Sequence, residues 1–139
     1  MNIITIDFET YYSRDFSLTK STTEEYVRSD LFQTIGVSVK ENDNEAQWFS
    51  GTHEEILNFL SNYDWSNSFA LAHNAMFDSA ILSWRFNIFP MAWLDTLSMA
   101  RATDGLEVGN SLAKLAVRYN LGRKGTRSEE HTSELQSRL

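Results

Sequence analysis

The 139-residue sequence predicts a mixed α/β layer fold built on a five-stranded sheet. The chain starts with one strand pattern, continues with a hairpin pattern and then alternates helical and strand patterns, which is typical of such folds. Apolar residues make up 42% of the chain, enough for the core of one domain of this length. The sequence shows no internal repeat, which argues against a repeat architecture.

Three strands are predicted in the first half of the chain. Residues 2–8 alternate between two faces, as a strand does. Residues 10–31 are polar and irregular, so we expect a loop or insertion with a short helix around 22–28. Residues 32–40 and 45–50 alternate again on either side of the turn sequence ENDNE, which predicts an antiparallel hairpin.

Helices and strands alternate after the hairpin. Thr52 and Glu55 have the spacing of a capping box, and the apolar residues that follow them recur at helical spacing. The run FALAH at 69–73 predicts a short buried strand. Asn74 is then expected to cap a helix over residues 75–86.

The last predicted elements are one strand and two helices. Residues 91–94 (MAWL) predict the fifth strand, and Asp95 is expected to cap the helix TLSMARA that follows. The segment SLAKLAVRYNL predicts a final amphipathic helix, with Gly122 as its end signal.

The composition excludes several classes of protein. A net charge of −7 argues against a protein that binds nucleic acid through a broad basic face. It does not exclude an acidic enzyme that binds phosphate through metal ions. The chain has no cysteine, which excludes disulfides and thiolate metal sites. It also lacks a signal-peptide pattern, and it has no apolar run of the roughly 20 residues that a membrane span needs. We expect a soluble intracellular protein with no membrane partner.

Two acidic residues stand at the end of the first strand. Asp7 and Glu9 are two positions apart, so a strand directs both to one face, about 7 Å apart. Such a pair repels unless a cation lies between the carboxylates, and Mg²⁺ bound through oxygen is the usual solution. Taken alone, the pair favours the alternative of two hydrated acids, because acid pairs are common at strand ends.

A third acid, Asp78, belongs to the stretch AHNAMFD, which follows the strand at 69–73. It lies in the first turns of the next helix, close to the carboxyl end of that strand, where open α/β sheets bind their ligands. On its own, the position also fits simple stabilisation by the helix dipole. In combination with Asp7 and Glu9, it favours a shared metal site.

Three separated motifs resemble the DEDD (DnaQ-like) 3′–5′ exonuclease family. They are IDFET at the end of the first strand, HNAMFD at the start of a helix, and WLDTLSMARATDGLEVGNSLAKLAVRYNLGRKGT further on. Over residues 2–126 the chain is similar to the proofreading exonuclease domains of family-A DNA polymerases, especially phage-type ones. The resemblance implies a ribonuclease H-like fold, with helices on both faces of the mixed sheet.

The resemblance also implies a reaction, the hydrolysis of phosphodiester bonds at a site with two Mg²⁺ or Mn²⁺ ions about 4 Å apart. Asp7 would bind both ions, Glu9 the ion that activates water, and Asp78 the second ion. Among the neighbouring residues, Thr10, Asn74 and Phe77 would contact the substrate. His73 and Asp95 are interpreted as structural, since Mg²⁺ prefers oxygen to imidazole and the Asp-Thr-Leu sequence is typical of a helix cap.

The family uses a fourth carboxylate, from a Tyr-x-x-x-Asp or His-x-x-x-Asp helix. Here Arg123 stands four positions after Tyr119, and Leu135 four positions after His131, so neither motif is present. The chain ends instead in RSEEHTSELQSRL, which looks like a translated sequencing adapter. We therefore expect an incomplete exonuclease domain over 1–126 and a non-native tail over 127–139, as in a metagenomic fragment. A genuine polar helix is the alternative for the tail.

These observations predict a 3′–5′ exodeoxyribonuclease that proofreads during DNA replication. Its partners would be the 3′ end of single-stranded DNA and a polymerase domain, C-terminal in the parent protein, in the cytoplasm of a bacterium or phage-infected cell. With three of four acids, the chain as given is expected to be weakly active or inactive. The alternatives are a ribonuclease H-like exoribonuclease and a non-catalytic nucleic-acid-binding module.

Overall fold

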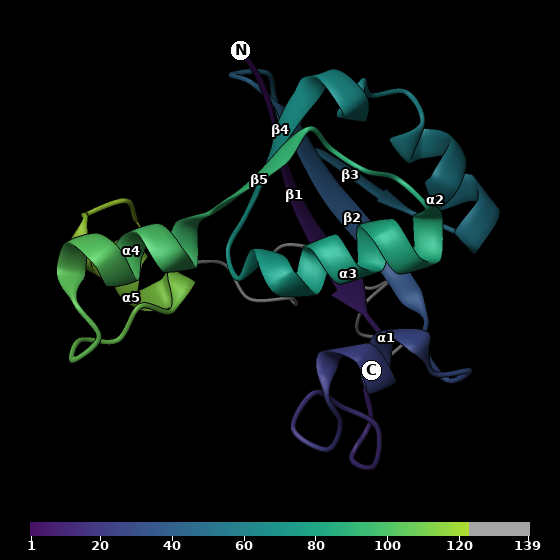
Figure 1. The fold of residues 1–139 in the computed structure, drawn as a ribbon, viewed down its shortest axis with the longest axis horizontal. Coiled ribbons are helices and arrows are strands. Elements are labelled where there is room, and N and C mark those ends of the chain that lie inside the picture. Colours follow the sequence, from purple (N-terminus) through teal and green to yellow (C-terminus); the bar gives the residue numbers. More distant parts are fainter. Residues whose placement is uncertain (123–139) are drawn as a thin grey trace.

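The computed structural model describes residues 1–122, shown as a ribbon in Figure 1. The predicted domain boundary after residue 126 and the predicted non-native tail, 127–139, lie outside the described residues. No helix in the described part of the chain is long and apolar enough to cross a membrane.

The described residues form the predicted mixed sheet of five strands, in the order β3-β2-β1-β4-β5. β1 pairs antiparallel with β2, and β2 with β3, whereas β1 pairs parallel with β4, and β4 with β5. The predicted hairpin is therefore confirmed. The strands are β1 (Asn2–Thr10), β2 (Thr34–Glu41), β3 (Gln47–Ser50), β4 (Ser68–Ala72) and β5 (Ala92–Asp95).

The described residues also form five α-helices and one 3₁₀-helix, of which α4 and α5 follow the last strand. The capping box predicted from Thr52 and Glu55 is confirmed, and Thr22 and Glu25 form a second one at the short helix expected around 22–28. The helices are α1 (Thr23–Arg28), α2 (His53–Leu60), η1 (Trp65–Asn67), α3 (Ala75–Phe86), α4 (Thr96–Asp104) and α5 (Leu112–Arg118).

The core lies between β1 and helices α1, α2 and α3. Ile4, Ile6 and Phe8 alternate along β1 and are all buried, together with residues from the three helices such as Val27 and Ile81. The residues that alternate with them on β1, including Asp7 and Glu9, face away from this core. The alternation of β1 therefore separates its packing residues from its acidic ones.

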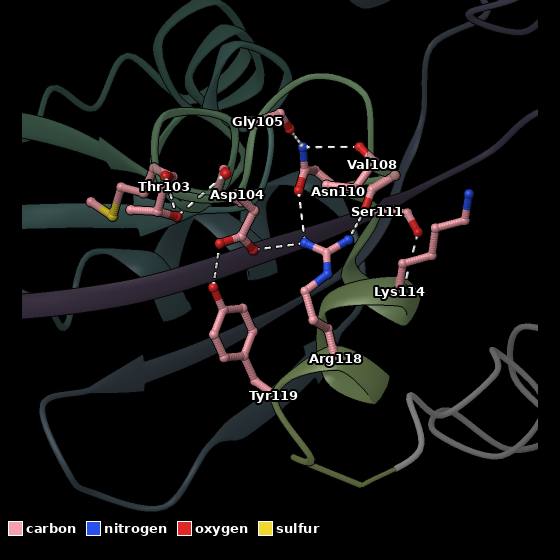
Figure 2. A network of polar contacts seen from close by, with 12 residues as sticks. Thr103, Asp104, Gly105, Val108, Asn110, Ser111, Lys114, Arg118 and Tyr119 are labelled. Atoms are coloured by element: carbon pink, nitrogen blue, oxygen red, sulfur yellow. Dashed lines mark hydrogen bonds and ion pairs between the residues drawn. The ribbon is translucent and has the colours of Figure 1, made fainter.

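Helices α4 and α5 form a pair that lies to one side of the sheet (Figure 1). Figure 2 shows the polar contacts that join them: Arg118 forms an ion pair with Asp104 at 2.7 Å, and the hydroxyl of Tyr119 donates to the same carboxylate at 2.6 Å. The buried Asn110 accepts a hydrogen bond from Arg118 at 3.1 Å. These contacts fix α5 against the end of α4.

The end of α5 differs from the prediction, which placed it at Gly122. The helix ends at Arg118, and Asn120 adopts a left-handed conformation with φ 54°. The amide of Leu121 then donates to the carbonyl of Ala116 at 2.8 Å, which closes the helix. Asparagine tolerates this conformation, so it supplies the turn that was expected from glycine.

Gly36 gives the first testable prediction. It pairs with Glu9 across β1 and β2, and a Cβ at this position would overlap the Trp48 ring and lie 2.7 Å from the carbonyl oxygen of Phe49. We expect Gly36→Ala to lower the free energy of unfolding by about 1–3 kcal/mol, because backbone cannot easily make room. Urea denaturation measures this change. Ser38→Ala, two residues along the strand, is the control and should change stability by only about 0.5 kcal/mol; equal effects would contradict the overlap.

Candidate active site at the end of β1

The acidic end of β1 extends past its parallel neighbour. Pairing between β1 and β4 runs as far as Thr5 and Leu71, after which the chain leaves β4 and enters α3. Asp7 is exposed and Glu9 half-buried on the same face of β1, as predicted. The carboxyl ends of two parallel strands therefore meet at these acids, which is where open α/β sheets bind ligands.

Asp78 reaches this end of β1 from the first turns of α3. Its side chain is only 3% exposed, and its Oδ1 accepts a hydrogen bond from the backbone amide of Phe8 at 3.1 Å. Phe8 lies between Asp7 and Glu9, and 70 residues separate it from Asp78. The structure thus brings Asp78 to the backbone segment that carries the other two predicted acids.

The three acids also act on one another electrostatically. Burial raises the pKa of Asp78 from 3.8 to about 8, the hydrogen bond from Phe8 opposes this rise, and the charges of Asp7 and Glu9 add to it. Functional sites often contain a buried carboxyl group whose pKa is raised by neighbouring acids. A divalent cation would reverse this effect, because it stabilises the ionised form of every carboxylate that binds it.

The residues present fit a hard metal ion by their chemistry, since all three offer carboxylate oxygens at one end of one strand. Within residues 1–122, however, no three acidic or histidine side chains are already arranged as a group that could hold a metal ion. Binding would therefore require the exposed Asp7 and half-buried Glu9 to turn toward Asp78. Both lie at the end of β1, where β4 no longer pairs with it.

The predicted cap of α3 is wrong. Asn74 has a left-handed backbone with φ 63°, and its side chain makes no capping hydrogen bond. Asp95 takes this role instead: its Oδ1 accepts the amide of Asn74 at 2.9 Å and that of Leu97 at 2.9 Å. The predicted cap of α4 by Asp95 is therefore correct, and the same carboxylate also serves α3.

His73 has a structural role, as the sequence predicted. Its Nε2 lies 2.9 Å from the carbonyl oxygen of Asn110, and its Nδ1 lies 2.9 Å from the hydroxyl of Thr96. A carbonyl oxygen can only accept, so Nε2 carries a proton and donates it to Asn110. Both ring nitrogens are thereby used to join the end of β4 to α4 and to the segment before α5.

A pocket of about 380 Å³ adjoins Glu9, which is within the usual size range of ligand sites. Two of the predicted substrate contacts, Thr10 and Phe77, line it. The hydroxyl of Thr10 is buried and pairs with the hydroxyl of Tyr26 at 3.0 Å, so it faces the protein rather than an open site. The third predicted contact, Asn74, is exposed and is not part of this pocket.

One wall of the pocket was not anticipated from the sequence. It comes from the segment between β1 and α1, which was expected to be an irregular loop. The stacked rings of Phe16 and Tyr26, with centroids 4.6 Å apart, hold this segment against the core. The repeated aromatic residues of the segment were the available signal. This wall consists of Tyr12, Ser17, Leu18 and Thr19, and Tyr26 of α1 lines the pocket beside it.

Comparison with known proteins identifies the fold. No family model matches this chain, and no curated protein matches it. Among solved structures, Brucella melitensis NrnC bound to pGG aligns with a TM-score of 0.66 and 16% identity, over 98% of this chain and 62% of NrnC. NrnC with bound Mg²⁺ aligns with a TM-score of 0.60 and 17% identity, over 96% of this chain and 62% of that one.

A structure described as the apo form of the nuclease aligns with a TM-score of 0.62 and 14% identity, over 94% of this chain and 57% of that one. The chain thus spans about three fifths of the length of these proteins. Sequence identities this low establish similarity of fold only. The predicted α/β fold with a mixed five-stranded sheet is confirmed, and these solved structures share it.

Proposed function

We propose that this chain is part of a metal-dependent 3′–5′ exonuclease that acts on single-stranded ends. The observation that carries the proposal is the hydrogen bond between Asp78 and the backbone amide of Phe8, which brings a buried carboxylate to the strand segment that carries Asp7 and Glu9. Burial and the charges of Asp7 and Glu9 raise the pKa of Asp78 to about 8. An acid that only stabilises the start of a helix would not need this environment, whereas a metal ligand often has it.

In this proposal, Asp7, Glu9 and Asp78 hold the Mg²⁺ or Mn²⁺ ions. When bound, such ions neutralise the charge of a scissile phosphate and activate a water molecule as nucleophile. The amide of Phe8 orients Asp78, and the core around Phe8 excludes water from the inner side of that carboxylate. The pocket beside Glu9 would take the terminal nucleotide, with Phe77 at its wall.

For the substrate, we propose single-stranded RNA as the first candidate. NrnC was solved bound to pGG, and this neighbour supports the exoribonuclease alternative better than proofreading within a DNA polymerase. The motif resemblance to polymerase exonuclease domains keeps single-stranded DNA as the second candidate. An attached polymerase domain and a cytoplasmic location remain predictions from that resemblance.

Metal binding is the first test. We expect Mn²⁺ to raise the melting temperature of the chain, because an ion that binds only the folded state adds about 2.7 kcal/mol of stability at 100 times its Kd. Asp7→Asn should abolish this rise. Asp43→Asn, in the exposed turn between β2 and β3, is the matched control and should retain it. If Mn²⁺ and Mg²⁺ leave the melting temperature of the unmodified chain unchanged, the proposed metal site is wrong.

Substrate choice is tested with 3′-labelled RNA and DNA single strands of one sequence, incubated side by side with Mg²⁺. We expect slow release of labelled mononucleotide, faster from RNA, and none from the Asp7→Asn variant. Faster release from DNA would instead favour a proofreading exonuclease that acts on DNA. Metal binding without cleavage of either strand would support the expectation that a fourth carboxylate is needed, and strong cleavage would refute it.

A further inference from the structure

We infer that Asp95 is a positioning residue, which holds α3 so that Asp78 stays in contact with β1. This inference rests on the proposed function, since Asp78 matters as a metal ligand only there. Asp95 itself lies at the end of β5, two strands away from β1 in the sheet. Its influence on the site would therefore pass through the backbone of α3.

The hydrogen bonds of Asp95 connect two helices. Oδ1 accepts the amides of Asn74, at the start of α3, and Leu97, at the start of α4, both at 2.9 Å. Oδ2 accepts the hydroxyl of Ser98 at 3.3 Å. A carboxylate that caps one helix normally satisfies donors of that helix alone, whereas this one satisfies a donor from each of two.

The start of α3 depends on this external acceptor. The side chain of Asn74 makes no capping bond, so the first amides of α3 have no local side-chain acceptor at that position. Although partial burial acts to raise it, hydrogen bonds from the amides of Leu97, Ala75 and Asn74 keep the pKa of Asp95 below its usual value. The ionised form therefore predominates at neutral pH, and it is the stronger acceptor.

A displacement at the start of α3 would reach the site directly. Asp78 follows Asn74 by one helical turn, and its Oδ1 accepts the amide of Phe8 at 3.1 Å. Hydrogen bonds lose strength steeply with distance and misalignment, so a shift of a few tenths of an ångström at this turn weakens the contact. In β4, Ala72 pairs with Asp95, which fixes the carboxylate beside the turn into α3.

The competing explanation is that Asp95 only caps α4. Asp95→Ser separates the two roles, because serine is a good N-cap for its own helix but is too short to reach the amide of Asn74. Asp95→Asn keeps Oδ1, which accepts both backbone amides, but it loses the charge and replaces Oδ2 with an amide nitrogen. Thr52→Ala removes the cap of α2, which is remote from α3, and serves as the control for a general loss of helix capping.

The experiment measures amide hydrogen exchange by NMR without metal, in the presence of EDTA. Exchange at Asn74 and Phe8 is compared with exchange at Val39, a core residue of β2. In Asp95→Ser we expect both amides to exchange about tenfold faster, the equivalent of one hydrogen bond of about 1.4 kcal/mol. In Asp95→Asn we expect a smaller acceleration, about threefold, because the bonds lose their charge assistance. Thr52→Ala should change neither ratio.

The inference is overturned if an Asp95 variant accelerates exchange at the Asn74 amide but leaves exchange at the Phe8 amide unchanged. It is also overturned if Thr52→Ala accelerates both amides equally. As a second readout, Mn²⁺ affinity should fall about tenfold in Asp95→Ser and stay unchanged in Thr52→Ala. If the unmodified chain binds no Mn²⁺, the proposed function fails, while the exchange measurement still decides whether Asp95 positions Asp78.

Discussion

Asp78→Asn is expected to stabilise the metal-free protein at pH 8 by a few kcal/mol. The side chain is 3% exposed, and burial together with the charges of Asp7 and Glu9 raises its pKa to about 8. Each unit of pKa difference between the folded and unfolded states corresponds to about 1.4 kcal/mol. An asparagine has the same shape, its Oδ1 can still accept the amide of Phe8, and it has no charge to bury.

The direction of the pH dependence follows from the raised pKa. Below about pH 4, Asp78 is protonated in both the folded and unfolded states and costs nothing. Between the unfolded value of 3.8 and the folded value of about 8, the unfolded state releases the proton first, so stability falls as pH rises. Above that range the full penalty is present, and Asp78→Asn removes it.

Urea denaturation in EDTA at several pH values measures the difference between the variant and the unmodified chain. We expect this difference to be close to zero near pH 4 and to grow toward pH 8. Asp43→Asn, at an exposed position, controls for the loss of one negative charge and should show no such growth. If the unmodified chain and Asp78→Asn are equally stable at pH 8, Asp78 does not carry an unfavourable charge in the folded state.

Local patterns were sufficient to predict most of the fold. The alternation along β1 placed Ile6 and Phe8 in the core and Asp7 and Glu9 on the other face, because strand geometry fixes this period. Motif order, rather than spacing alone, joined Asp78 to the two acids of β1. The structure adds the contact that the sequence could not provide, from the carboxylate of Asp78 to the amide of Phe8.

Apart from the end of α5, the differences from the prediction came from tertiary contacts. Asn74 has the residue type and position of a helix cap, but Asp95, 21 residues further on, provides the acceptor because β4 and β5 pair side by side. The segment between β1 and α1 likewise has no periodic pattern. Its order comes from rings such as Phe16, stacked against Tyr11 and Tyr26, and the aromatic residues of the segment are the only trace of this packing in its sequence.

The second large effect is expected for Phe8→Ala, which should lower the free energy of unfolding by about 3–5 kcal/mol. Phe8 is 4% exposed, and its ring stacks on Phe86 of α3 with centroids 5.8 Å apart. Removing the ring leaves a cavity between β1 and α3 in addition to the lost burial of apolar surface. Phe89→Ala, at a position that is 62% exposed, is the matched control and should change stability by about 0.5 kcal/mol or less.

Urea denaturation at pH 7 with and without Mn²⁺ distinguishes packing from charge at the same contact. Phe8→Ala keeps the amide that binds Asp78 and all three acids, so we expect a less stable protein whose stability still rises with Mn²⁺. Asp78→Asn should give the opposite pair of results, a more stable protein without a response to Mn²⁺. A loss of the Mn²⁺ response in Phe8→Ala would mean that the ring itself, beyond its backbone amide, holds Asp78 in place, because the ligands are unchanged in that variant.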